Sequence, residues 1–309
     1  MPELSELPCL TLGQALSQAS QQGLDRFEAQ VLLLHVLQKH TTEAQRHSPG
    51  LPSPSPVQER GRAWLLAHDQ DDLPWAVARE FQALVERRLL GEPVAYLTGE
   101  RGFFGLSLQI DARVLDPRPD TETLVEWALE LLKKRTAPPE VLDLGTGSGA
   151  IALAIQHHGP QGIQVSAVDA SPEALAVAQA NEQRLRGQGM KPIVFYWGSW
   201  LAPVAGQRFD LIVSNPPYIA EGDAHLGALC HEPRKALVSG PEGLDDLRHL
   251  IAHAPKHLQP GAWLLLEHGW DQAPAVRQLL TQAGFEQVKS RKDLAGIERC
   301  SGGHWPDSR

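Results

Sequence analysis

The fold of this chain is decided by the stretch Val141-Leu142-Asp143-Leu144-Gly145-Thr146-Gly147-Ser148-Gly149. Its first half is mostly apolar and predicts a short buried strand, and its glycines predict a tight turn into a helix over 150–157. Backbone N–H groups at a helix N-terminus carry partial positive charge, and glycine lets that backbone come close to a ligand. A strand, a glycine turn and a helix in this order predict a unit of a doubly wound α/β sheet, with a ligand at the turn.

Beyond this stretch, strands and helices alternate to the end of the chain. Short apolar runs predict further strands at 165–169, 193–196, 209–214 and 262–267. Apolar residues at helical spacing predict helices over 172–186, 244–258 and 273–283. This alternation is typical of a parallel sheet that is covered on both faces. The segments 285–289 and 297–300 predict a final hairpin at one edge of the sheet.

The part of the chain before this sheet has a different character. Helical spacing of apolar residues predicts helices over 25–40 and 75–90, and a proline-rich segment separates them at 48–56. Glycine-rich turns between short apolar stretches then predict a β-hairpin. We therefore expect three parts: a helical domain over 1–92, a β-hairpin linker over 93–118, and the α/β domain over 119–309.

Composition limits the class of protein. The chain has 309 residues, of which 42% are apolar and 21% charged, as is ordinary for a globular protein. Its net charge of −9 disfavours broad binding to nucleic acid, which depends on neutralising phosphates. Cys9, Cys230 and Cys300 have no CxxC spacing, and we find neither a signal-peptide pattern nor an apolar run of about 20 residues. We expect a cytoplasmic protein without disulfides, zinc or a membrane span.

The glycine turn has a carboxylate partner. Asp169 ends the next expected strand, where it can accept hydrogen bonds from ribose hydroxyls. A dinucleotide site normally has G-x-G-x-x-G, whereas this chain has G-x-G-x-G after Asp143. The pattern resembles the first motif of class I methyltransferases that use S-adenosyl-L-methionine (AdoMet). A dinucleotide, or a turn that only packs the helix on the strand, is the alternative interpretation.

A second motif, Asn215-Pro216-Pro217-Tyr218, follows the expected strand at 209–214. The two prolines restrict the backbone directly after Asn215. The side-chain carbonyl of Asn215 and the backbone carbonyls of Asn215 and Pro216 then form a group of acceptors beside an aromatic ring. Such a group suits the planar NH2 of a carboxamide or of a base amine. The motif therefore predicts methyl transfer to nitrogen, with Asn215, Pro216 and Tyr218 as catalytic residues and Pro217 as a further substrate-binding residue.

Taken together, the two motifs resemble those of the PrmC/HemK-type peptide-chain release factor glutamine methyltransferases. The resemblance covers about residues 88–303, and further matching stretches are Gly91 to Gly99, Arg118 to Glu122, Glu232-Pro233 with Ala236-Leu237, Leu266 to Gly269, and Lys292 to Gly296. It implies a class I AdoMet-dependent methyltransferase fold at 119–309, Rossmann-like with a mostly parallel seven-stranded sheet. A small helical substrate-recognition domain and a bridging β-hairpin would precede it. The implied reaction moves a methyl group from AdoMet to the side-chain nitrogen of the glutamine in the Gly-Gly-Gln motif of class I release factors.

The resemblance also assigns the cofactor site. The loop Gly145 to Gly149 would hold the methionine part of AdoMet, Asp169 the ribose, and Trp200 the adenine. Arg118 and Asp120 would lie over the mouth of the site. The full implied set is Gly145, Thr146, Gly147, Ser148, Gly149, Asp169, Trp200, Asn215, Arg118 and Asp120. For Trp200 a place in the core is the alternative, and for Arg118 and Asp120 a helix-capping loop.

Two other functions share these motifs. Adenine-N6 methyltransferases of nucleic acids carry similar tetrapeptides, because an adenine amine is also a planar NH2, but they need a basic face. An idle AdoMet-binding scaffold is the second alternative. His225, His231 and Glu232 match no metal spacing and predict a surface loop, while Asp116 departs from the family pattern. Glu267 and His268 are left without a role. We expect a monomer that binds release factors and holds no nucleic acid stably.

Overall fold

The computed structural model describes residues 10–47, 61–187 and 189–307, so the proline-rich segment at 48–56 lies outside the described residues. The chain divides into two compact units, Met1–Thr98 and Gly99–Arg309. Helix α5 (Val94–Thr98) belongs to the first unit because Val94 and Leu97 pack against its apolar core. The helical unit therefore extends beyond residue 92, where the sequence placed its end.

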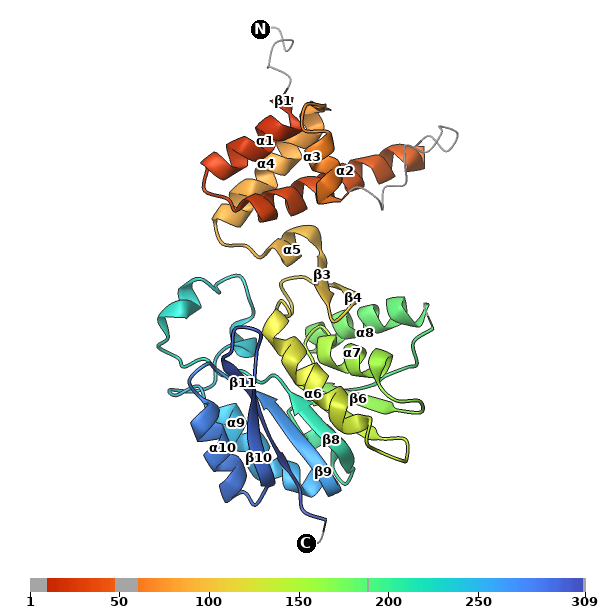
Figure 1. The fold of residues 1–309 in the computed structure, drawn as a ribbon, viewed down its shortest axis with the longest axis vertical. Coiled ribbons are helices and arrows are strands. Elements are labelled where there is room, and N and C mark those ends of the chain that lie inside the picture. The colour runs from red at the N-terminus through yellow and green to blue at the C-terminus, as the bar shows by residue number, and fades with distance from the viewer. Residues whose placement is uncertain (1–9, 48–60, 188, 308–309) are drawn as a thin grey trace. The chain divides into compact units, whose positions relative to one another are not determined.

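The first unit is helical (Figure 1). Its other helices are α1 (Leu12–Gln21), α2 (Arg26–His47), α3 (Arg62–Ala67) and α4 (Trp75–Leu89), and two short strands, β1 (Leu10–Thr11) and β2 (Asp72–Leu73), pair antiparallel. A capping box begins α1, because the Thr11 hydroxyl accepts from the Gln14 N–H while the Gln14 side chain accepts from the Thr11 N–H. Buried residues such as Leu32, Val36 and Phe81 form one core.

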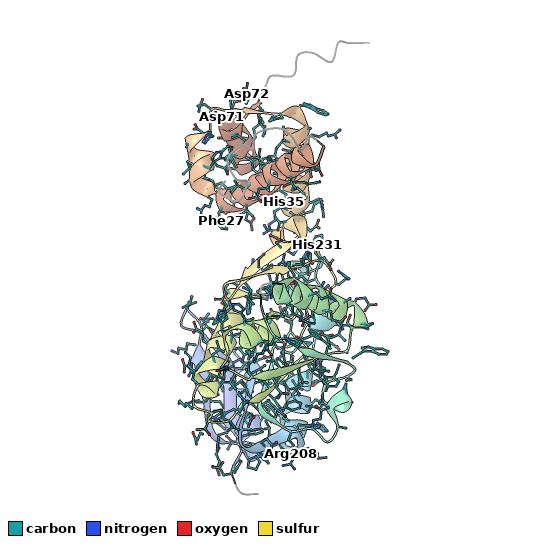
Figure 2. The ribbon with its side chains drawn as sticks, turned by 90° about the vertical axis from the view of Figure 1, so that its right-hand side faces the viewer. Phe27, His35, Asp71, Asp72, Arg208 and His231 are labelled. Carbon is teal, nitrogen blue, oxygen red and sulfur yellow. The ribbon has the colours of Figure 1, made fainter. Side chains whose placement is uncertain are left out.

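One exposed aromatic of this unit has a cationic neighbour. Phe27 of α2, labelled in Figure 2, is 51% exposed, and the Arg62 guanidinium lies 4.5 Å from the centre of its ring. No helix of the described ranges is both long enough and apolar enough to cross a membrane.

The second unit contains the sheet. Its strands are β3 (Glu100–Phe103), β4 (Leu106–Gln109), β5 (Glu140–Leu144), β6 (Gln164–Asp169), β7 (Val194–Trp197), β8 (Phe209–Ser214), β9 (Leu258–Glu267), β10 (Glu286–Lys292) and β11 (Glu298–His304). Strands β3 and β4 form a hairpin, and the other seven form one sheet in the order β10-β11-β9-β8-β5-β6-β7. The first five of these strands along the chain are parallel and the final hairpin is antiparallel. The expected mostly parallel, seven-stranded sheet with a hairpin at one edge is confirmed.

Helices cover both faces of this sheet (Figure 1). They are α6 (Glu122–Leu132), α7 (Ala150–His158), α8 (Pro172–Arg186), α9 (Asp245–His253) and α10 (Ala273–Gln282). Leu264 of β9 shares a core cluster with Leu250 of α9 and Val276 of α10. Its neighbour Trp263 points to the other face, because successive side chains alternate along a strand, and there it meets Trp127 of α6 at 6.2 Å between ring centres.

The order of the strands creates a ligand crevice. From β5 the chain continues to β6 and β7 on one side and then returns to β8 on the other, so the strand order reverses between β5 and β8. Ligands of open α/β sheets bind at the carboxyl ends of the strands at such a reversal. Leu144 and Ser214 are partners in the register, and the Ser214 hydroxyl donates to the Leu144 carbonyl at 2.7 Å. The glycine turn after Leu144 and the motif after Ser214 therefore lie side by side.

Candidate active site

The glycine turn has a backbone that other residues adopt only with strain. Gly145, Gly147 and Gly149 have φ values of +71°, +55° and +83°. A Cβ on Gly149 would lie 3.0 Å from Leu153 Cδ1 and 3.2 Å from Ala178 Cβ. A Cβ on Gly147, by contrast, would meet no atom within 4 Å. The turn is thus closely packed on its helix side and open at Gly147, where its backbone can face a ligand.

The buried carboxyl group of Asp143 stabilises the glycine turn through a hydrogen bond from Thr146. The Thr146 hydroxyl donates to Asp143 Oδ2 at 2.6 Å, and Asp143 is fully buried. Burial raises the pKa of Asp143 to about 7, although the hydrogen bond from Thr146 acts in the opposite direction. Asp143 therefore supports the shape of the turn and becomes ionised only near neutral pH.

We expect Asp143→Asn to be more stable than the wild type at alkaline pH. Because the folded-state pKa of Asp143 lies above its ordinary value of 3.8, the native state keeps a proton that the unfolded state has lost. The unfolding free energy therefore falls as pH rises through this window, by on the order of a few kcal/mol. Asparagine does not titrate, so the stability gap in favour of the variant should widen from about pH 5 to about pH 8. Urea denaturation across this range tests the point, and a gap independent of pH would contradict it.

Asp169 joins the end of β6 to the glycine turn. Its Oδ2 accepts from the Gly147 N–H at 2.8 Å and its Oδ1 from the Ser171 N–H at 2.9 Å. Burial raises the pKa of Asp169, and these backbone hydrogen bonds oppose the shift. A carboxylate has about four acceptor positions, and the backbone N–H groups do not fill all of them, so Asp169 can also accept from a ribose hydroxyl. The open glycine turn and this carboxylate together fit the AdoMet that the sequence predicts.

Two tryptophans, Trp200 and Trp197, lie near the glycine turn and Asp169. Trp200 has a φ of +47°, and its ring carbon Cζ3 lies 3.3 Å from where a Cβ on Gly145 would be. Its ring also packs against the apolar core, so contact with the turn and a packing role occur together. Trp197, which the sequence analysis did not single out, is the register partner of Asp169 and is 70% exposed. Trp197 ends β7, the strand next to β6, which ends at Asp169. That position in the sequence could have indicated that Trp197 lies near the site.

The Asn-Pro-Pro-Tyr corner borders a cavity of about 110 Å³. Asn215 Nδ2 donates to Thr121 Oγ1 at 3.3 Å, and the Tyr218 hydroxyl donates to Glu267 Oε1 at 3.3 Å. Burial, followed by the nearby Glu267 carboxylate, raises the pKa of Tyr218, which therefore stays protonated. The cavity is lined by Leu115, Arg118, Asn215, Tyr218, Ile219, Leu229, Ala236 and Leu237. With about 30 Å³ per water molecule as a scale, it has room for a small planar group.

Arg118 lines this cavity and is held by two buried acids. It pairs with Glu232, and its Nη1 lies 3.5 Å from Asp116 Oδ2, while the other oxygen of Asp116, Oδ1, lies 3.4 Å from Arg101 Nε. Burial raises the pKa of Asp116, while the two arginines lower it. The ion pairs with Arg101 and Arg118 thus compensate for the burial of the Asp116 carboxylate. The expectation that Glu232 lies in a surface loop is wrong: Glu232 is only 7% exposed, because it pairs with Arg118.

Asp120 lies against the final hairpin. Its Oδ2 is 3.4 Å from Arg299 Nε, and Arg299 also pairs with Asp293 at 3.0 Å. His225 is exposed and contacts Asp223 at 2.7 Å. Within residues 10–47, 61–187 and 189–307, no three side chains of the types that bind metals are grouped as a metal site. The structure thus brings together the glycine turn, Asp169, Trp200, Asn215, Tyr218 and Arg118, and it ties Asp120 to β11.

A parallel sheet with a glycine turn after β5, a carboxylate after β6 and an amide corner after β8 defines an α/β methyltransferase domain. Comparison with known proteins agrees with this class. Residues 123–288 match the family described as Methyltransferase small domain, and residues 10–99 match the PrmC N-terminal domain.

The individual relatives are more specific. The release factor glutamine methyltransferase of Bordetella pertussis is 49% identical over 285 residues, covering 91% of this chain and 96% of the relative. That of Xylella fastidiosa is 47% identical over 294 residues, covering 94% and 98%. A solved protein-(glutamine-N5) methyltransferase (release factor-specific) from Alicyclobacillus acidocaldarius is 33% identical with a TM-score of 0.39, covering 62% of this chain and 94% of that one. This chain belongs to the release factor glutamine methyltransferase family.

Proposed function

We propose that this protein transfers a methyl group from AdoMet to the side-chain amide nitrogen (N5) of the glutamine in the Gly-Gly-Gln motif of class I peptide-chain release factors. The observation that carries the proposal is the Asn215 corner, which borders a small cavity and follows the strand that pairs with the one leading into the glycine turn. The shared sequence with release factor glutamine methyltransferases over nearly the whole chain supports the same substrate.

The Asn215 corner can activate a poor nucleophile. An amide nitrogen is a weak nucleophile, because its lone pair is delocalised into the carbonyl group. Asn215 Oδ1 and the Pro216 carbonyl accept its two N–H groups, which orients the nitrogen and stabilises the positive charge that develops on it. Bound AdoMet supplies an electrophilic methyl group on a sulfonium. Orientation of this kind lowers a barrier by about 7–11 kcal/mol in the best cases, so no nucleophilic side chain is needed.

The other residues of the proposed site bind the cofactor or pack against the substrate amide. The turn Gly145 to Gly149 holds the methionine part of the cofactor, Asp169 the ribose and Trp200 the adenine. Tyr218 and Pro217 pack against the substrate amide, and Arg118 lines the same cavity. Asp120, through Arg299, steadies the segment that carries Arg118.

We also propose a role for the parts of the chain that precede the methyltransferase domain. The helical domain expected over 1–92 adds contact area for a folded protein substrate, since one glutamine buries too little surface for a specific complex. The segment expected as a linker over 93–118, which contains α5 and the hairpin of β3 and β4, leads to the methyltransferase domain over 119–309. The protein acts as a cytoplasmic monomer, and its net charge of −9 disfavours stable nucleic-acid binding and therefore the adenine-N6 alternative.

The function is tested by incubating the protein with labelled AdoMet and an unmethylated release factor. We expect the peptide that contains Gly-Gly-Gln to gain the mass of one methyl group. The matched control is a release factor in which that glutamine is alanine, and it should gain nothing. Label that enters DNA or RNA, with the release factor unmodified, would favour the adenine-N6 function instead.

A further inference from the structure

The side chain of Gln272 connects the Asn-Pro-Pro-Tyr corner to two other turns of the second unit. Its Nε2 donates to the Tyr218 carbonyl at 3.0 Å and to the Gly243 carbonyl at 3.2 Å. Its Oε1 accepts from the Gly269 N–H at 2.8 Å. A backbone N–H can only donate and a carbonyl oxygen can only accept, so these contacts define which end of the amide carries the NH2. The Gln272 amide thus joins the segments that follow β8 and β9 to the turn before α9.

The backbone of these turns comes close to the Gln272 amide. A Cβ on Gly243, which has a φ of +70°, would lie 2.2 Å from the Tyr218 carbonyl oxygen and 3.0 Å from Gln272 Nε2. A Cβ on Gly269 would lie 3.1 Å from Gln272 Oε1. Glycine at both positions therefore leaves the space that the amide occupies, and the amide is part of a closely packed site.

Gln272 directly precedes α10, so capping of that helix is the simpler explanation for its contacts. A capping side chain accepts a hydrogen bond from one of the first N–H groups of its helix. Within the part of the chain that the structure describes, the Gln272 side chain makes no such bond. Its hydrogen bonds to the corner and to the two turns, and not helix capping, thus account for the position of the amide.

The turn at Gly269 is a fixed support for this amide. His268 is fully buried, and its Nδ1 donates to the Gly269 carbonyl at 2.9 Å. Because a carbonyl only accepts, the hydrogen of the neutral ring is on Nδ1, and Nε2 accepts from the Ser301 hydroxyl at 2.7 Å. Burial lowers the pKa of His268, which keeps the ring in this neutral form. The support that Gln272 uses is therefore itself held by β11.

We propose that Gln272 is a positioning residue, which holds the Tyr218 carbonyl and thereby keeps the acceptor oxygens of the corner in place for the substrate amide. The inference rests on the proposed function, since it assumes that a carboxamide occupies the cavity at the corner. Pro216 and Pro217 have fixed φ angles, so few free rotations separate Asn215 from Tyr218. Strand β8 holds the start of this short segment and Gln272 holds its end, so a displacement at Tyr218 also moves Asn215.

Gln272→Glu separates the two ends of the amide. Glutamate keeps the length and an acceptor for the Gly269 N–H, but it directs a carboxylate oxygen at the Tyr218 and Gly243 carbonyls, which repel it. We expect kcat on a release factor to fall about 100-fold, as when a reacting group is displaced by about 1 Å. A side chain that only supported the Gly269 turn would tolerate this exchange.

Gln272→Met removes both hydrogen-bonding ends without adding a charge. We expect it to lower kcat by about 10-fold, which corresponds to the loss of a neutral hydrogen bond. The AdoMet dissociation constant and the KM for the release factor should stay within a few-fold of the wild type in both variants, because the proposed cofactor contacts lie at the glycine turn and Asp169. Both variants should still unfold cooperatively, since the Ile219 N–H donates to the Leu237 carbonyl at 2.8 Å and keeps the chain after the corner paired.

A double variant tests whether Gln272 acts through the corner. In an Asn215→Ala background, the main acceptor that Gln272 positions is already lost. Gln272→Glu should then lower the single-turnover rate by no more than a few-fold, compared with about 100-fold in the wild-type background. A side chain with a merely structural role would lower the rate by the same factor in both backgrounds.

Gln278→Glu is the matched control, because it makes the same exchange at an exposed position of α10. It should keep the wild-type kcat. Wild-type kcat in Gln272→Met would overturn the inference, whether or not the glutamate variant folds, and so would losses from Gln272→Glu and Asn215→Ala that multiply in full. A wild type that leaves the release factor unmethylated would instead overturn the proposed function, so the two failures are distinct.

Discussion

Asn215→Ala should lower kcat for glutamine methylation by about 1000-fold or more, while AdoMet still binds. In the proposed mechanism the side chain supplies the acceptor that orients the substrate nitrogen, and the loss of one preorganised contact of this kind costs about 100- to 1000-fold. The alanine variant also leaves Thr121 without the Nδ2 donor at 3.3 Å, which adds disorder at the corner. Single-turnover transfer of labelled methyl to a release factor measures the effect.

Two measurements separate this loss from misfolding. Calorimetric titration with AdoMet should give a dissociation constant within a few-fold of the wild type, because the proposed site assigns most of the cofactor contacts to Asp169 and the glycine turn. The melting temperature should change little, since Asn215 is only partly buried and lies just beyond the end of β8. Turnover at the wild-type rate would remove Asn215 from the mechanism.

Asp169→Ala should weaken AdoMet binding by on the order of 100-fold. A hydrogen bond to a charged group contributes about 1.5–3 kcal/mol, and the variant would lose the hydrogen bonds that we propose Asp169 makes to the ribose. It also frees the Gly147 and Ser171 N–H groups, which now donate to the carboxylate at 2.8 and 2.9 Å, so the glycine turn loses support. Titration calorimetry gives the dissociation constant directly.

A graded variant and a control sharpen this prediction. Asp169→Asn keeps the volume but only one acceptor oxygen, so its affinity should lie between those of the wild type and the alanine variant. Asp71→Ala changes an exposed aspartate of the first unit, labelled in Figure 2, and should leave the affinity unchanged. Equal affinities of the wild type and Asp169→Ala would show that the carboxylate does not hold the ribose.

The sequence by itself determined the kind of sheet, its two loops and the family. The strand, glycine turn and helix at 141–157 are a local pattern, since glycine at a positive φ and an apolar run are legible without knowing what lies nearby. The parallel pairing of the later strands follows from their alternation with helices, and the observed register confirms it. The family prediction is confirmed by relatives that share nearly the whole chain. The roles of Asn215 and Asp169 stay predictions.

Only the tertiary structure decided which polar groups meet behind those loops. Glu232 was expected on the surface, yet it is buried against Arg118, which lies more than a hundred residues earlier in the chain. Thr121 and Glu267 come from different elements and contact the same corner, and no spacing in the sequence connects them. The physical reason is that a buried charge or hydroxyl needs a partner within about 3 Å, and folding, not the order of residues, decides which partner arrives there.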